Sequence, residues 1–377
     1  MPRNELDEQA DALEARIADD PADAEAWMVY ADLLQKLGDP LGELIALQRA
    51  AEAERAASPT GKRGTAELAV RKYFAKHAPA LLGALARFVK DVRESSAPPL
   101  FWRSGMIARV QLDGGPGPSD PGPAVIVDEV LRHPSGRLLG ELAVKTDTAA
   151  EARAVIAALE RARPTALREL ELYVRDDLGD LDGLWSALPR LRVLSITART
   201  FELGKLDVPT VRRARFLGLV VSPRCMQSIA QAPWPVLQRL ELRLGSRFGK
   251  LPAAFEDLAP LLHRTDMPAL THLKIRGAAF AGSICRALLT SPLAAQLEVL
   301  DLSHGAVNPR DAALLGQSKG RFARLQELWL PRSGLTADAI RALEGVAKHV
   351  IDDHRAPVDR LNEELGAGTE RDDYDNE

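Results

Sequence analysis

Cysteine and long apolar runs are scarce in this sequence, and each shortage excludes a class of protein. The 377 residues include only two cysteines, Cys225 and Cys285, which excludes a disulfide framework and a zinc site made of cysteine alone. No run approaches the ~20 apolar residues of a membrane helix, so we expect no membrane contact. Residues 1–8 are polar and acidic, unlike a signal peptide. We therefore expect a cytoplasmic protein.

Motifs of common active sites are also missing. The seven histidines lack the i, i+4 spacing of a helical metal site. Gly61-Lys62 suggests a phosphate-binding loop, but Ala56 replaces its first glycine and Arg63 its Ser or Thr. We expect no nucleophile elbow. The sequence thus predicts no enzyme activity, no cofactor and no metal.

What the sequence does contain is a repeat. The pattern Leu-x-x-Leu-x-Leu, with conservative substitutions, starts at positions 107, 139, 167, 191, 211, 237, 270, 297 and 325. In a strand alternate side chains face opposite ways, so the second and third apolar positions of each copy point into a core. One such strand cannot bury its apolar face alone, but stacked copies form a parallel sheet with a continuous core.

Helix signals stand between several of these strands. Thr148 to Glu151 reads as a capping box, Asn308-Pro309 precedes a helical pattern, and so does Thr336. Strand-then-helix units over 107–345 resemble the ribonuclease-inhibitor style of leucine-rich repeat. The resemblance implies an α/β solenoid with a parallel sheet on its concave face and helices on its convex face. The Asn or Cys usual after the last template leucine is absent, so we expect irregular turns.

The N-terminal segment reads as helices at 5–18, 22–37 and 40–57. Its motifs are Asp20-Pro21, Val29-Tyr30-Ala31-Asp32, Gly38-Asp39-Pro40, then Ile45 and Leu47-Gln48, followed by His77 to Gly83. In this order they resemble the "repeat-companion" module of bacterial leucine-rich-repeat proteins, over about residues 5–110. Leu33 and Leu81 stand where that family usually has Trp. The resemblance implies an all-α cap on the solenoid and no catalytic activity.

These patterns predict four parts of the chain. A helical module occupies 1–57, a linker and a capping helix at 65–91 occupy 58–100, and a solenoid of about nine repeats occupies 101–350. The last part, 351–377, has the acidic composition of a disordered tail. The capping helix should dock near Phe101 and Trp102, and the Pro/Gly-rich stretch at 113–123 should be a spacer.

Charge is distributed unevenly along the chain. Residues 1–57 hold 14 acidic and 5 basic side chains, and residues 352–377 hold 10 and 3. The whole chain is at −4, so residues 58–351 carry +12. Such asymmetry indicates a charged partner or contact between parts of the chain.

In each repeat three side chains should face away from the core: those flanking the second template leucine and the one after the third. Over the repeats that start at 211, 237 and 270, these positions hold six Lys or Arg and one Glu. We therefore predict a groove in which the basic residues hold an acidic protein segment and Trp329 anchors an apolar side chain. The predicted binding residues are Arg213, Arg215, Arg239, Arg243, His272, Lys274, Arg276, Tyr173 and Trp329.

Several alternatives stay open at this point. The charged face could simply be solvated, or the chain's own acidic tail could fold back onto it as a salt-sensitive competitor. The solenoid could also recruit substrates for a separate enzyme or regulate a GTPase. A net charge of −4 and the 5% aromatic content argue against nucleic acid as the partner. A non-catalytic protein-interaction scaffold is the function that the sequence favours.

Overall fold

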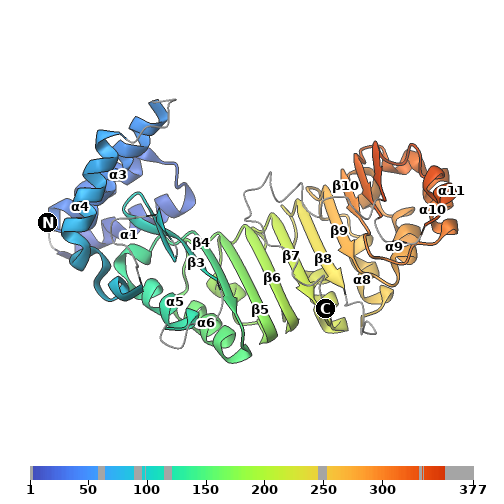
Figure 1. Cartoon of the computed structure of the whole chain (residues 1–377), viewed down its shortest axis with the longest axis horizontal. Helices are drawn as coiled ribbons and strands as arrows, with labels where there is room; N and C mark the ends of the chain where they lie inside the picture. Colours follow the sequence, from blue (N-terminus) through green and yellow to red (C-terminus); the bar gives the residue numbers. More distant parts are fainter. Residues whose placement is uncertain are drawn as a thin grey trace. The chain divides into compact units, whose positions relative to one another are not determined.

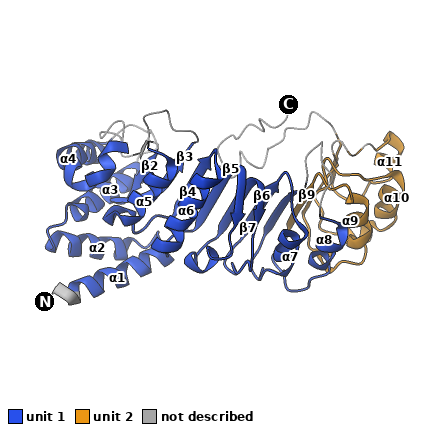
Figure 2. Ribbon diagram, turned by 90° about the horizontal axis from the view of Figure 1, so that it is seen from below, with its two compact units in different colours: residues 1–270 blue, residues 271–377 orange. Residues whose placement is uncertain are grey.

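The computed structural model describes residues 3–57, 64–88, 96–97, 99–113, 121–244, 253–330, 333 and 335–352. Most of the predicted linker, of the Pro/Gly-rich spacer and of the acidic tail lies outside these residues. The chain divides into two compact units, residues 1–270 and 271–377, coloured separately in Figure 2. The four parts predicted above stay a prediction.

The first unit begins with helices. They are α1 (Arg3–Asp19), α2 (Ala24–Lys36), α3 (Pro40–Ala57), α4 (Thr65–Leu82) and the 3-10 helix η1 (Gly83–Phe88). The three helices predicted for the N-terminal module are confirmed. The predicted helix 65–91 is too long, because α4 ends at Leu82. Pro79 lies within its last turn, and Gly83 follows with a φ of +49° that stops the α-helix.

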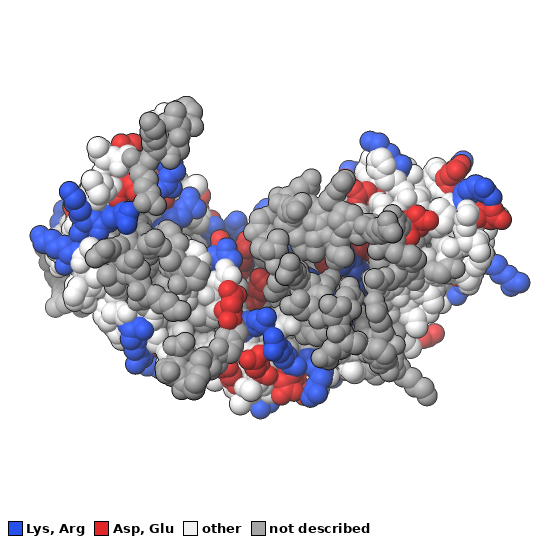
Figure 3. Space-filling model, viewed as in Figure 1, with Lys and Arg blue, Asp and Glu red and all other residues white. Residues whose placement is uncertain are grey.

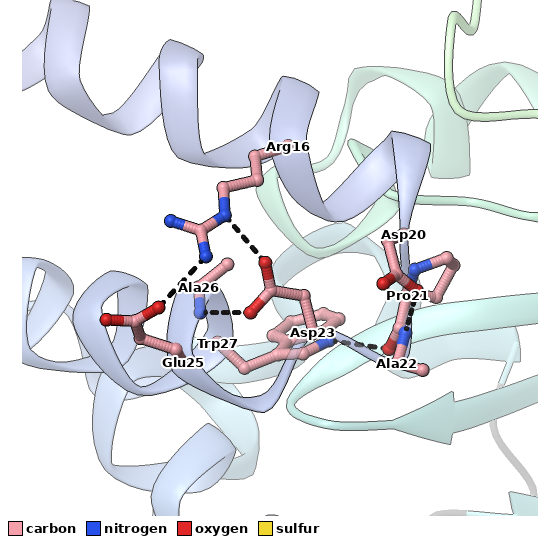
Figure 4. A network of polar contacts seen from close by, with 8 residues as sticks. All are labelled: Arg16, Asp20, Pro21, Ala22, Asp23, Glu25, Ala26 and Trp27. Carbon is pink, nitrogen blue, oxygen red and sulfur yellow. Dashed lines mark hydrogen bonds and ion pairs between the residues drawn. The ribbon is translucent and has the colours of Figure 1, made fainter.

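The corner between α1 and α2 explains why Asp20-Pro21 and Trp27 belong together (Figure 4). The indole Nε1 of Trp27 donates to the carbonyl oxygen of Pro21 at 3.0 Å. Asp23 caps α2 by accepting from the backbone N–H of Ala26 at 2.9 Å, and its other carboxylate oxygen accepts from Arg16 Nε at 2.6 Å. These residues shape a turn and a helix start.

Strands follow these helices. The sheet elements of the first unit are β1 (Ser96–Ala97), β2 (Leu100–Arg103), β3 (Met106–Leu112), β4 (Glu141–Thr146), β5 (Glu169–Asp180), β6 (Val193–Glu202), β7 (Arg213–Gly218) and β8 (Arg239–Leu244). Strands β4 to β8 each start two residues after the first template position of their repeat. Pairing is antiparallel from β1 to β3 and parallel from β3 to β8. The template leucines stand in register: Leu142 pairs with Leu170, and Leu170 with Leu194.

Helices and turns connect these strands. They are α5 (Pro123–Arg132), η2 (Pro134–Gly136), α6 (Ala149–Ala162), η3 (Trp185–Ala187), α7 (Pro223–Gln231) and α8 (Phe255–Leu262). The predicted cap at Thr148 is confirmed, since its hydroxyl accepts from the N–H of Glu151 at 3.3 Å. Helices α5 and α6 pack against β4 and β5 on one side of the sheet (Figure 1). The template leucines are buried under them, with Leu167 and Leu170 at most 1% exposed.

The helical module packs on the start of this sheet. Phe74 of α4 meets Trp102 of β2 edge-on with ring centroids 5.3 Å apart, as expected for the capping helix. The buried side chain of Gln48 on α3 accepts from the N–H of Gly105, in the turn between β2 and β3, at 2.6 Å. An all-α cap therefore closes one end of the sheet, where the antiparallel strands would otherwise be exposed.

The second unit repeats the same design. Its elements are β9 (His272–Arg276), α9 (Ala281–Leu288), η4 (Pro292–Ala295), β10 (Val299–Asp301), α10 (Pro309–Gln317), η5 (Lys319–Phe322), β11 (Glu327–Trp329), α11 (Ala337–Arg341) and β12 (His349–Ile351). Strands β9 to β12 pair in parallel and in chain order. Asn308 and Thr336 cap α10 and α11 as predicted. The chain thus has the leucine-rich-repeat solenoid fold with an all-α N-terminal cap.

Candidate functional site

The face of the first unit's sheet that lies opposite the buried leucines consists of aligned rows of side chains, and we call it the open face. Strand pairing places the predicted outward residues beside one another in three rows. One row is Arg109, Glu141, Glu169, Val193, Arg213 and Arg239. The next is Gln111, Ala143, Glu171, Ser195, Arg215 and Glu241, and the third is Lys145, Tyr173, Thr197, Leu217 and Arg243. Most of these side chains are half-buried, between neighbours that are fully buried.

Charge on the open face changes sign across the sheet. Acidic side chains gather on β4 and β5, polar and apolar ones stand on β6, and arginines gather on β7 and β8. Arg213 reaches back to Glu169 at 3.7 Å, and Arg215 lies 3.8 Å from Glu241. Because these partners are partly exposed, each pair stabilises the fold by less than about 1 kcal/mol. Figure 3 likewise shows both signs of charge among the described residues of the side that it presents.

The acidic half of the open face carries unfavourable charge. Glu141 lies beside Glu169 on the next strand, and its pKa is raised first by burial and then by the charge of Glu169. Tyr173, the predicted aromatic anchor of this half, lies under the ammonium group of Lys145, which is 4.9 Å from its ring centre. A cation–π contact of this kind positions the ring.

Two buried polar atoms at the centre of the open face lack a hydrogen-bond partner among the described residues. They are the hydroxyl oxygen of Ser195, a residue that is 8% exposed, and the Nε of Arg215, which lies 3.8 Å from a carboxylate oxygen of Glu241, beyond hydrogen-bond distance. Ser195 and Arg215 are register neighbours on β6 and β7. Leaving such an atom unpaired costs about 1–3 kcal/mol, which a ligand supplying the missing hydrogen bond would remove. The sequence placed Ser195 on the outward side of its strand but gave it no binding role, because a small residue in a strand carries no such signal.

The remaining predicted binding residues belong to the second unit. His272 shares a hydrogen bond of 2.8 Å between its Nδ1 and the hydroxyl of Thr271. Lys274 is half-buried on β9, and Arg276 Nε donates to Asp301 at 2.8 Å. On β11, the indole Nε1 of Trp329 donates to Glu327 at 2.8 Å. Arg276 and Trp329 therefore already have partners within their own unit.

Three outward-facing positions of the second unit are buried. Val299, Asp301 and Ser303 were expected on the open side of their strand, yet all three are buried. The carboxylate of Asp301 accepts from Arg276 on one side and from the backbone and hydroxyl of Ser303 on the other. Alternation along a strand predicts direction, but here a buried ion pair occupies the outward side.

Nucleophile candidates among the described residues include the two cysteines and one serine motif. Burial raises the pKa of both thiols, Cys225 and Cys285, and so disfavours the thiolate form that acts as a nucleophile. The sequence does contain one Gly-x-Ser-x-Gly stretch, at 316–320, contrary to expectation. Its Ser318 lies where α10 ends and η5 begins, and a nucleophile elbow needs a strand-to-helix turn. Within the described residues no group of three His, Cys, Asp or Glu is placed to hold a metal.

Comparison with known proteins bears on the fold. A Bacteroides fragilis protein of known crystal structure matches 78% of this chain and 84% of its own, with a TM-score of 0.50 and 17% identity. An internalin from Listeria monocytogenes matches 66% of this chain and 83% of its own, with a TM-score of 0.28 and 11% identity. No protein-family model and no curated sequence matches this chain. Among the described residues, no helix has the length and apolar character needed to span a membrane.

Proposed function

We propose that this chain is a non-catalytic scaffold that binds an acidic segment of a partner protein on the open face, over strands β6 to β8. The observation that carries the proposal is the pair of unsatisfied buried polar atoms, Ser195 Oγ and Arg215 Nε. A carboxylate oxygen accepts from a hydroxyl and from a guanidinium at once, and hydrogen bonds to a charged group are the stronger kind. One Asp or Glu of a bound segment would satisfy both atoms.

The charges around this pair favour a peptide over a nucleic acid. Glu169 and Glu171 on β5, and Glu241 among the arginines of β7 and β8, would repel a continuous phosphate backbone that crossed the face. Tyr173 is the only aromatic side chain in the three rows, and stacking of successive bases needs several. A short acidic segment, by contrast, meets the arginines of β7 and β8 without crossing the glutamates of β4 and β5.

We also infer the repeat type and the nature of the cap. The strand-then-helix units support the ribonuclease-inhibitor style of repeat over 107–345. The structural roles of Asp20-Pro21 in the corner before α2 and of Gln48 against the first hairpin support a repeat-companion module over 5–110. Both assignments concern architecture, and the binding proposal does not depend on them.

The binding proposal predicts that charge reversal on the open face abolishes capture of the partner. We would replace Arg215, Arg239 and Arg243 by Glu and compare affinity capture from native lysate with that of the intact chain. A matched variant reverses three exposed charges elsewhere: Lys72, Arg153 and Arg310, each without a hydrogen-bond or ion-pair partner among the described residues. We expect the captured protein to be lost only from the open-face variant, by at least about tenfold, because reversal replaces attraction by repulsion.

Circular dichroism would first establish that both variants are folded. Equal capture by all three proteins would rule out the open face as the binding surface. Loss from both variants would show that net charge alone decides binding. Restoration of binding by an Arg-substituted partner segment would identify the complementary acidic residues.

The acidic tail, whose residues 353–377 lie outside the described part, stays a predicted competitor for the same face. Deleting residues 352–377 should then raise the affinity for a labelled hexa-aspartate peptide by at least about threefold at low salt, and by much less at high salt, since screening weakens a tethered charge contact. Fluorescence anisotropy measures both. The control keeps the tail length but changes its Asp and Glu to Asn and Gln. Unchanged affinity after deletion would dismiss the competitor.

A further inference from the structure

Three arginines stand side by side where consecutive strands of the first unit begin. Arg168, Arg192 and Arg212 each come directly before β5, β6 and β7. The backbone N–H of Arg192 donates to the carbonyl of Arg168 at 2.7 Å, and that of Arg212 to the carbonyl of Arg192 at 2.8 Å. Neighbouring strands are about 4.8 Å apart, so the three side chains form a short row of like charge. None of them belongs to the open face.

The first member of this row already binds an acidic helix end within the chain. Arg168 donates through its guanidinium to the carbonyl of Ala18, in the last turn of α1. Beside it, Arg190 Nε donates to the carboxylate of Asp19 at 2.6 Å. That hydrogen bond is the largest cause of the lowered pKa of Asp19, and the charges of Arg168 and Arg192 add to it. The negative end of the helix dipole strengthens the same contact.

This contact accounts for part of the uneven charge of the chain. The acidic module thus ends α1 on the basic edge of the sheet. The remaining two arginines of the row are exposed and have no hydrogen-bond or ion-pair partner among the described residues. Burial lowers the pKa of Arg168 most and repulsion by the charge of Arg192 lowers it further, whereas Asp19 and Asp20 raise it. An anion placed against Arg192 and Arg212 would relieve that repulsion.

We propose that Arg192 and Arg212 form a docking edge for a partner protein, distinct from the open face, that receives an aspartate-bearing helix end. The chemistry is that of Arg168 with the end of α1, because Arg192 and Arg212 hold the same position directly before the next two strands. The row is bounded by Gly140 before β4 and by Gln238 before β8, neither of which is charged. Its length suits two carboxylates and is too short to follow a phosphate backbone.

The test uses the full chain after the arginines of the open face have been neutralised, so that binding there is weakened. Arg215, Arg239 and Arg243 are changed to Gln, which adds no negative charge, and binding of a labelled hexa-aspartate peptide is measured by anisotropy at low salt. We expect residual binding in this background. Changing Arg192 and Arg212 to Gln as well should weaken it at least about fivefold, whereas changing the exposed Arg153 and Arg310 to Gln should not, because only the first pair is adjacent.

Each other outcome overturns the docking edge. No residual binding in the open-face background would mean that the edge holds no acidic segment, and equal weakening by the two pairs would mean that it has no special role. A six-nucleotide single-stranded DNA that binds as tightly as hexa-aspartate, and is lost with the same pair, would make the edge a general anion site. The proposed function fails separately, through equal binding of hexa-aspartate to the intact chain and to the open-face variant.

Discussion

Replacing Arg276 by Met is expected to destabilise the second unit by about 3–5 kcal/mol, because it leaves a buried carboxylate without its cation. The side chain of Asp301 is 2% exposed and that of Arg276 is 18% exposed. Their contact is a hydrogen-bonded ion pair of 2.8 Å. Removing one partner of such a pair costs far more than the pair contributes, since the remaining charge cannot reach water.

A double-mutant cycle separates this effect from a simple loss of contacts. Asp301→Leu combined with Arg276→Met removes both charges, and we expect it to recover most of the stability lost in either single variant. Urea unfolding followed by tryptophan fluorescence measures the change, and Trp329 pairs with Asp301 in register and reports locally. Arg324 is the control: it pairs with Glu298 at 3.0 Å in the same unit, but 61% of its side chain is exposed. Arg324→Met should cost less than about 1 kcal/mol.

A double variant that loses as much stability as the two single variants together would mean that Arg276 and Asp301 act independently, and would contradict this account. The result also decides how binding is tested. A binding defect in an Arg276 variant would report a damaged second unit, whatever the partner contacts. For that reason the open-face variants use Arg215, Arg239 and Arg243, all in the first unit.

Leucine spacing was sufficient to predict the strands, because burial of the template positions is what holds the repeats together. All nine templates correspond to strands, β3 to β11, and the predicted helix starts at Thr148, Asn308 and Thr336 are capped as expected. Strand β12 was missed, since its segment from Val346 to Ile351 has no template leucine. Strands β1 and β2 were missed because they pair antiparallel, outside the repeat.

For the candidate site, the sequence predicted only which side chains point outward from each strand, and not which of them contact one another. Alternation identified the outward residues of the first unit, but pairing depends on register across strands. Arg213 lies 3.7 Å from Glu169, two strands away, on the far side of Val193 in the same row. The burial of Asp301 and the unsatisfied hydroxyl of Ser195 depend on what surrounds them in space. Neither property can be predicted from the residues that are adjacent in the sequence.

Replacing Gly105 by Ala is expected to loosen the helical cap from the sheet, and to cost about 1–3 kcal/mol more than the same change at Gly38. Both glycines have a φ of +74°, so both variants pay the same backbone strain of about 1 kcal/mol. Nothing lies within 4 Å of a Cβ at Gly38, whereas a Cβ at Gly105 would lie 2.4 Å from Cγ1 of Ile45 and 3.0 Å from its backbone nitrogen.

Gly105→Ala is more costly because Gly105 belongs to a turn that packs against α3. Ser104 and Gly105, both with positive φ, form the two-residue turn between β2 and β3, and this turn sits directly on α3. Ile45 provides its packing surface and Gln48 its hydrogen bond, so the residues that resemble a family motif are those that attach the cap. Urea unfolding would compare the two variants, and hydrogen exchange should show protection lost in α3 and in the hairpin only for Gly105→Ala. Equal losses in both variants would mean that strain alone acts, and that the cap is held to the sheet by other contacts, such as those of Phe74 with Trp102 and of Arg190 with Asp19.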